Sequence, residues 1–212
     1  MPGNPALFEP LEDTIRTVFL PVLLRREVND LERDLISLPA RMGGMGVVKP
    51  TEECVISHTN SVYVSEPLVR LVKHQGFELN PVELSTEIKK LRVDVDAEND
   101  ARNKLKLERI LEAAPEELKL ALKAASEKGA SSWVTAAPSY DHGTVLHKGE
   151  FTDAICIRYG WPLPNLPLKC ACGTAFDIQH ALDCKLGGLR TIQHNEVRDV
   201  WLNACVKLVT HW

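Results

Sequence analysis

Three cysteines and one histidine gather in a short stretch late in the sequence, and they constrain the fold more than any other feature. They are Cys170, Cys172, His180 and Cys184. Thiolates and an imidazole are preferred ligands of tetrahedral Zn²⁺, and four protein ligands leave no open position for chemistry. We therefore expect a structural zinc knuckle over residues 170–184, with Zn²⁺ as its cofactor.

The spacing of these ligands suits a turn followed by a helix. One residue separates the first two cysteines, and Gly173 gives the backbone the freedom to turn both sulfurs toward one point. His180 and Cys184 are four residues apart, so one helical turn places them on the same face. The one-residue gap is tighter than the usual spacing of paired ligands. If that gap strains the site, His194 is the nearest substitute ligand.

Composition describes a soluble chain with a sizeable core. The 212 residues are 44% hydrophobic, which is enough to bury a substantial core. The longest apolar run, from Val18 to Leu24, is interrupted by Pro21 and is too short to cross a bilayer. The opening residues have neither the basic nor the apolar region of a secretory signal. We expect an intracellular protein, nuclear or cytoplasmic, that makes no membrane contact.

The six cysteines fall into two groups. In a reducing compartment the clustered ones are better explained by metal than by disulfides. Cys54, Cys156 and Cys205 instead stand alone among apolar neighbours, so we predict that they are small buried hydrophobic residues.

Apolar residues recur at three- and four-residue intervals through the first half of the chain, which predicts amphipathic helices. We expect one helix over residues 10–29 with a kink or break at Pro21, and a short second helix capped by Asn29. Further helical segments are expected over residues 51–77, with Pro67 starting a new segment.

A long charged helix over residues 83–113 and a second over 115–128 predict a helical hairpin. We therefore predict a mainly α-helical fold with two parts. Residues 1–129 would form a helical domain containing the long hairpin, and residues 130–212 would form a linker, the small zinc knuckle and a C-terminal helix.

The glycine-rich stretch over residues 38–50 allows two interpretations. Glycines beside Arg41 invite a phosphate-binding loop, but no Lys-Ser/Thr pair follows the last glycine. A tight turn where helices meet closely is the interpretation that we favour.

A catalytic site is not expected. His142 and His147 lie near Asp141, but no nucleophile or second acid at a suggestive spacing accompanies them. We therefore predict that the chain is not an enzyme.

The last stretch predicts a helix with an apolar stripe. Its members are Val197, Val200, Trp201, Ala204, Cys205 and Leu208. This helix would dock on the rest of the chain or meet a protein partner.

Charge gives little support for strong nucleic-acid binding by the isolated chain. The net charge is −4 and the pI is about 6.0, whereas nucleic-acid binding usually shows as a basic patch. The candidate phosphate contacts are Arg158, Lys169, Lys185, Arg190 and Arg198. Acidic residues lie among them, so binding to RNA or DNA would be weak.

Several blocks of the sequence resemble one family. In chain order they are Leu31–Gly46, Trp133, His142–Gly143, Asp153–Pro167, Cys170–Cys184 and His194–Asp199. Together they are similar to the region downstream of the polymerase in non-LTR retrotransposon reverse-transcriptase polyproteins. There, a helical thumb or connector region leads to a Cys-Cys-His-Cys knuckle, and many members continue into a restriction-like endonuclease.

The resemblance implies that the cluster opened by Cys170 occupies the knuckle positions and that residues 194–199 begin the nuclease region. The paired aspartates of the polymerase and the Pro-Asp…Asp/Glu-x-Lys core of the nuclease have no counterpart in this sequence. We therefore expect a non-catalytic connector, as a fragment or a domesticated remnant, that positions RNA or DNA. The alternative is a structural or protein-interaction helical domain whose zinc serves stability alone.

Overall fold

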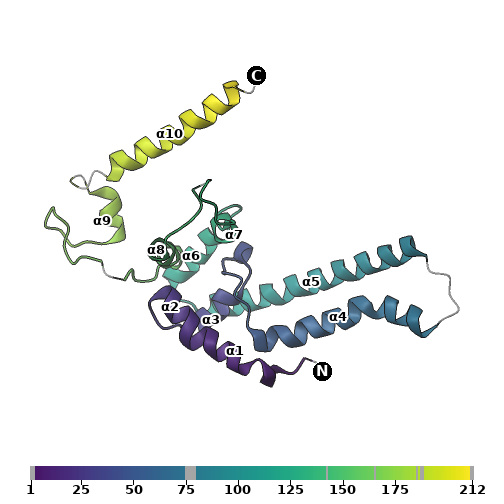
Figure 1. Cartoon of the computed structure of the whole chain (residues 1–212). Helices are drawn as coiled ribbons and strands as arrows, with labels where there is room; N and C mark the ends of the chain where they lie inside the picture. Colours follow the sequence, from purple (N-terminus) through teal and green to yellow (C-terminus); the bar gives the residue numbers. More distant parts are fainter. Residues whose placement is uncertain are drawn as a thin grey trace. The chain divides into compact units, whose positions relative to one another are not determined.

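Helices make up the fold, as predicted. The computed structural model describes residues 3–74, 80–141, 143–164, 166–184, 186 and 189–210. The helical elements are η1 (Pro5–Leu7), α1 (Glu9–Thr14), η2 (Ile15–Phe19), α2 (Leu20–Leu24), α3 (Asp30–Ser37), η3 (Ala40–Met42), α4 (Pro50–Lys73), α5 (Pro81–Ala113), α6 (Glu116–Ala125), α7 (Ser132–Thr135), α8 (Lys148–Tyr159), α9 (Ile178–Asp183) and α10 (Leu189–Thr210) (Figure 1). Within the described ranges, β pairing is limited to one isolated antiparallel bridge. The mainly α-helical fold class is confirmed.

The chain divides into two compact units, Met1–Pro162 and Leu163–Trp212. The boundary expected after Gly129 falls inside the first unit, because α8 packs against both α2 and α6. Among the described residues, no helix combines the length and hydropathy that a membrane span requires.

The first helix runs without a gap from α1 through η2 into α2. The break predicted at Pro21 takes the form of a π-helical turn, in which the N–H of Leu20 donates to the carbonyl of Ile15. A π turn shifts the hydrogen-bond register by one residue just before the proline, which has no N–H to donate. Arg25 then ends α2 in the left-handed conformation, with φ of 54°.

The next helix, α3, starts where the sequence predicts. The side chain of Asn29 accepts the backbone N–H of Glu32, and the Glu32 carboxylate accepts the N–H of Asn29, which is a complete capping box. Leu35 and Ile36 on this helix are fully buried and form the centre of the first unit's core.

The long hairpin consists of α4 and α5 (Figure 1). Lys106 pairs with Glu52 at 2.8 Å near one end of the hairpin, and Arg70 pairs with Glu87 at 2.7 Å near the other. Residue numbers rise along α4 from the first ion pair to the second and fall along α5, so the two helices are antiparallel. A hairpin was expected between residues 83–113 and 115–128. The long hairpin instead pairs α5 with α4, while α6 makes its main contacts with α8.

Pro67 lies within α4 and does not start a new segment, so this prediction is also wrong. A proline inside a helix removes one hydrogen bond, but tertiary packing can compensate for the loss. Pro67 is buried and lines the space between α4 and α5, together with Leu71 and Leu84.

The glycine-rich stretch is a tight turn, as favoured above. A Cβ on Gly44 would lie 1.9 Å from the carbonyl oxygen of Leu38, so only glycine fits there. The buried hydroxyl of Tyr159 donates to the carbonyl of Gly43 at 2.8 Å. The turn thereby links α3 to α8 through a hydrogen bond of its own backbone.

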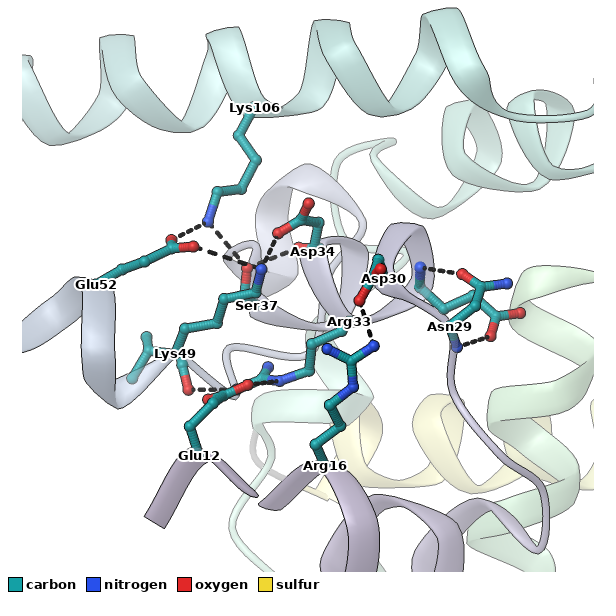
Figure 2. A network of polar contacts seen from close by, with 12 residues as sticks. Glu12, Arg16, Asn29, Asp30, Arg33, Asp34, Ser37, Lys49, Glu52 and Lys106 are labelled. Atoms are coloured by element: carbon teal, nitrogen blue, oxygen red, sulfur yellow. Dashed lines mark hydrogen bonds and ion pairs between the residues drawn. The ribbon is translucent and has the colours of Figure 1, made fainter. Parts of the chain in front are cut away.

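One buried cation organises the first unit, and the sequence did not indicate it. The Arg33 side chain is fully buried, and its guanidinium donates twice to the Glu12 carboxylate, at 2.8 Å each. It also donates to the carbonyls of Val47 and Val48, at 2.7 and 3.0 Å. Figure 2 shows this group beside the network of Lys49 with neighbouring acids. Arg33 therefore links α1, α3 and the segment before α4.

Candidate metal centre

A short β-like turn positions the first two thiols. Lys169 and Ala175 form the antiparallel bridge, and the N–H of Cys170 donates to the carbonyl of Thr174 at 2.9 Å. The N–H of Gly173 closes the turn by donating to the carbonyl of Cys170 at 2.8 Å. Gly173 adopts φ of +87°, a conformation that glycine reaches without strain. This geometry explains how a one-residue gap can bring both sulfurs to one side.

Helix α9 positions the other two ligands. The Asp177 carboxylate caps its N-terminus and accepts the backbone N–H of His180 at 2.6 Å. Cys184 stands at the C-cap, where its N–H donates to the carbonyl of His180 at 2.8 Å. The ligands are four residues apart and therefore lie one above the other on the same helical face.

The turn and the helix bring all four predicted ligands together. One donor atom from each of Cys170, Cys172, His180 and Cys184 lies within 4.8 Å of the others. The Sγ atoms of Cys170 and Cys184 are 3.6 Å apart, and the Sγ of Cys172 is 3.2 Å from Nε2 of His180. The sulfur separation is far beyond a disulfide bond, and the thiols are free. The cluster can hold one metal ion.

The thiol environment favours a ligand that is charged at neutral pH. Hydrogen bonding from Thr174 lowers the pKa of Cys172 to about 6, against the opposing effect of lost solvation. The backbone N–H of Cys172 acts to lower the pKa of Cys170, but lost solvation and the adjacent thiols outweigh it, so this pKa is raised. Since the thiolate is the form that ligates metals, Cys172 is already prepared for coordination.

The surroundings of the cluster are partly apolar, and the proposed substitute ligand lies elsewhere. The ring of Phe176 meets the His180 imidazole edge to face, with centroids 6.3 Å apart. Leu182 is 40% exposed. His194 lies exposed in α10 and does not belong to the cluster.

The candidate phosphate contacts come from both units of the chain. Arg158 lies on α8 in the first unit, where it donates to the Ser131 hydroxyl at 2.7 Å and stacks over Tyr159. Lys169 is exposed on the turn, and Arg198 is exposed on α10. Lys185 and the side chain of Arg190 lie outside the described residues.

Of the two histidines near Asp141, the structure describes His147. The His147 side chain accepts the N–H of Gly149 at 3.2 Å and caps α8. His142 lies outside the described residues. Cys156 is buried, as predicted, and burial raises its pKa. Cys54 is half-buried, and the side chain of Cys205 is not among those described.

Sequence reasoning found the four clustered residues but missed the two that position them, Thr174 and Asp177. Asp177 stands three residues before His180, which is the spacing of an N-cap, so a capping signal was present.

Together the fold and the site define a helical protein whose second unit carries a Cys₃His cluster that could hold a metal ion. Comparisons with protein-family models, with curated proteins and with solved structures found no match.

Proposed function

We propose that this chain is a non-catalytic, zinc-bound connector of the kind found after the polymerase in non-LTR retrotransposon reverse transcriptases, and that it positions RNA or DNA. The observation that carries the proposal is the convergence of three thiols and one imidazole within 4.8 Å. The order of the resembling blocks in the sequence connects this cluster to that family of connectors.

Zinc is the metal that the donor set suits best. Soft thiolates with one imidazole select Zn²⁺ over the oxygen-preferring cations. Tetrahedral Zn²⁺ with its usual bond lengths separates two sulfurs by about 3.8 Å, and a sulfur from a nitrogen by about 3.6 Å. The observed 3.6 Å between Cys170 and Cys184 is close to the first value, and the 3.2 Å between Cys172 and His180 is about 0.4 Å shorter than the second.

The coordination argues for a structural role. Four protein ligands complete a tetrahedral shell, whereas catalytic zinc keeps one position for water or substrate. The second unit is small, and few of its described side chains are buried, so a metal can hold its turn and α9 together where apolar burial cannot. The zinc in this proposal stabilises a shape.

Electrostatics support modest affinity for nucleic acid. Residues 163–212 contain five Lys and Arg residues and four Asp and Glu residues. Lys169 and Arg198 are exposed, and Arg198 forms an exposed ion pair with Asp199 that a phosphate would have to replace. Phosphate contacts of this kind are strongest at low salt and weaken as counterions compete.

The same near balance of charge favours one alternative, a helical protein-interaction domain whose zinc serves stability alone. Arg158 adds to this case, since its guanidinium is turned toward Ser131 and Tyr159. The two functions differ in a single measurable property, which is affinity for nucleic acid at low ionic strength.

The test is a fluorescence-anisotropy titration of labelled RNA and DNA oligonucleotides at about 50 mM salt and at higher salt. The wild-type protein is compared with Cys184→Ala, which removes a cluster residue, and with Cys54→Ala, which removes a thiol outside the cluster. We expect salt-dependent binding by the wild type and Cys54→Ala, and a loss in Cys184→Ala. If the wild type does not bind nucleic acid at low salt, the nucleic-acid function is refuted and the protein-interaction domain remains.

A further inference from the structure

Helix α10 presents one face on which a cation and two rings are aligned. His194, Arg198 and Trp201 are spaced by four and three residues, so they lie along one side of the helix. All three are exposed, and 68% of Trp201 is accessible. From His194 to Trp201 the helix rises about 10 Å, which is close to the length of three stacked nucleotides.

Of the two acidic residues in this segment, Glu196 lies on the other side of the helix and Asp199 pairs with Arg198. Glu196 stands two residues before Arg198, which places it on the far side of the helix at about 100° per residue. Asp199 is the next residue after Arg198 and pairs with its guanidinium at 2.9 Å. Both partners are more than half exposed, and an exposed ion pair of this kind contributes little, so a phosphate can replace the carboxylate.

We infer that this α10 face binds single-stranded nucleic acid, with Trp201 stacking on a base and Arg198 contacting a phosphate. An exposed indole gains a partner when it stacks on a base, and stacking platforms combined with cations are the usual means of holding single strands. His194 extends the face as a second ring. A duplex keeps its bases stacked on each other, so Trp201 has no free base plane to use there.

This inference rests on the proposed function and deepens it by naming the strand type and the face that binds it. It assigns a role to Trp201 and His194 as well as to Arg198. The metal cluster and this face serve different purposes, since the cluster holds the shape and α10 makes the contact.

The experiment measures anisotropy of labelled oligo-U, oligo-dT and a duplex of equal length, using the full zinc-loaded chain. The variants are Trp201→Ala, Arg198→Gln and Asp199→Asn. Val200→Ala is the matched control, because Val200 is equally exposed at 67% but lies about 100° round the helix. Circular dichroism and metal content confirm that each variant is folded.

The variants are expected to differ in their affinity for single strands and in how that affinity depends on salt. Trp201→Ala should weaken single-strand binding about fivefold or more without changing its salt dependence. Arg198→Gln should reduce the slope of log affinity against log salt by about 0.7. Asp199→Asn should strengthen binding, since it removes the competing carboxylate, and Val200→Ala should bind like the wild type.

Two results would overturn the inference while leaving the proposed function intact. One is wild-type binding that Trp201→Ala and Arg198→Gln leave unchanged. The other is a duplex bound as tightly as the single strands. Absence of any nucleic-acid binding by the wild type would instead refute the proposed function together with this inference.

Discussion

Removing the counter-ion of Arg33 should destabilise the first unit more than any other single change to a charged residue on α1. The Arg33 side chain is fully buried, and the Glu12 carboxylate that faces it is only 15% exposed (Figure 2). The Glu12→Ala variant leaves the guanidinium with two carbonyl acceptors, on Val47 and Val48, and no opposite charge. A buried charge without its partner pays the full cost of lost hydration.

The expected size follows from that geometry. Breaking a buried ion pair by removing one partner typically costs about 3–5 kcal/mol. Because Glu12 is at the edge of the buried region, water can reach part of the vacated space, so we expect about 3 kcal/mol. Arg16→Ala on the same helical run is the matched control. It removes an exposed pair with Asp30, and such pairs contribute at most about 1 kcal/mol.

Urea unfolding followed by far-UV circular dichroism measures both changes. Glu12→Ala should lower the midpoint strongly with little change in slope, while Arg16→Ala should stay near the wild type. Equal midpoints for the two variants would refute the claim that the Arg33–Glu12 pair organises this unit.

Three further changes test individual features. Gly44→Ala places a Cβ against the Leu38 carbonyl and should cost about 2 kcal/mol or more in urea unfolding, and a wild-type midpoint would argue against the tight turn. Gly173→Ala forces a left-handed residue with a side chain into the metal-site turn, so a chelator competition should show metal affinity about 5- to 30-fold weaker, and unchanged affinity would argue against this turn geometry. Burial acts to raise the pKa of Glu52, but the hydrogen bond and charge of Lys106 outweigh it, so the folded-state pKa is lowered from the usual 4.5. The ionised Glu52 therefore stabilises the fold at a pH above 4.5, and this stabilisation is lost as the pH falls through the lowered folded-state pKa. In Glu52→Gln the melting temperature should depend less on pH between about pH 6 and pH 3 than in the wild type.

Local signals in the sequence were sufficient for the helix starts and for the metal cluster. The Asn29 to Glu32 capping box lies within four consecutive residues, so its geometry is decided by neighbours in the chain. The cluster behaves similarly, because Cys170 and Cys172 lie in one tight turn closed at Gly173, and His180 and Cys184 are one helical turn apart. Such features need no knowledge of distant segments.

Features that depend on distant segments could not be predicted from pattern alone. Arg33 lies in a polar stretch of sequence, and arginine is rarely buried without a partner. Its partner Glu12 is 21 residues away, and only the tertiary fold of the first unit brings the two side chains together. The hairpin is a second case, since the stripe on α5 is compatible with either helical neighbour, and contacts such as Glu52 with Lys106 decide the pairing.

At Pro67 a local sequence rule predicted a helix boundary that the folded protein does not have. A proline is a reliable sign of a helix boundary in an isolated peptide, because a hydrogen bond is lost and the preceding residue is restricted. Packing of α4 along α5 buries Pro67 and maintains the helix on both sides of it. Tertiary contacts therefore override the local rule at this position.

The most direct test of the account is the metal content of protein purified without added metal. Elemental analysis should find about one zinc per chain in the wild type, as four protein ligands require. Cys54→Ala should match the wild type, whereas Cys184→Ala should hold far less, because it loses the buried thiol of the cluster. Equal zinc in Cys184→Ala and the wild type, or no zinc in the wild type, would contradict the assignment of the Cys₃His cluster as a zinc site.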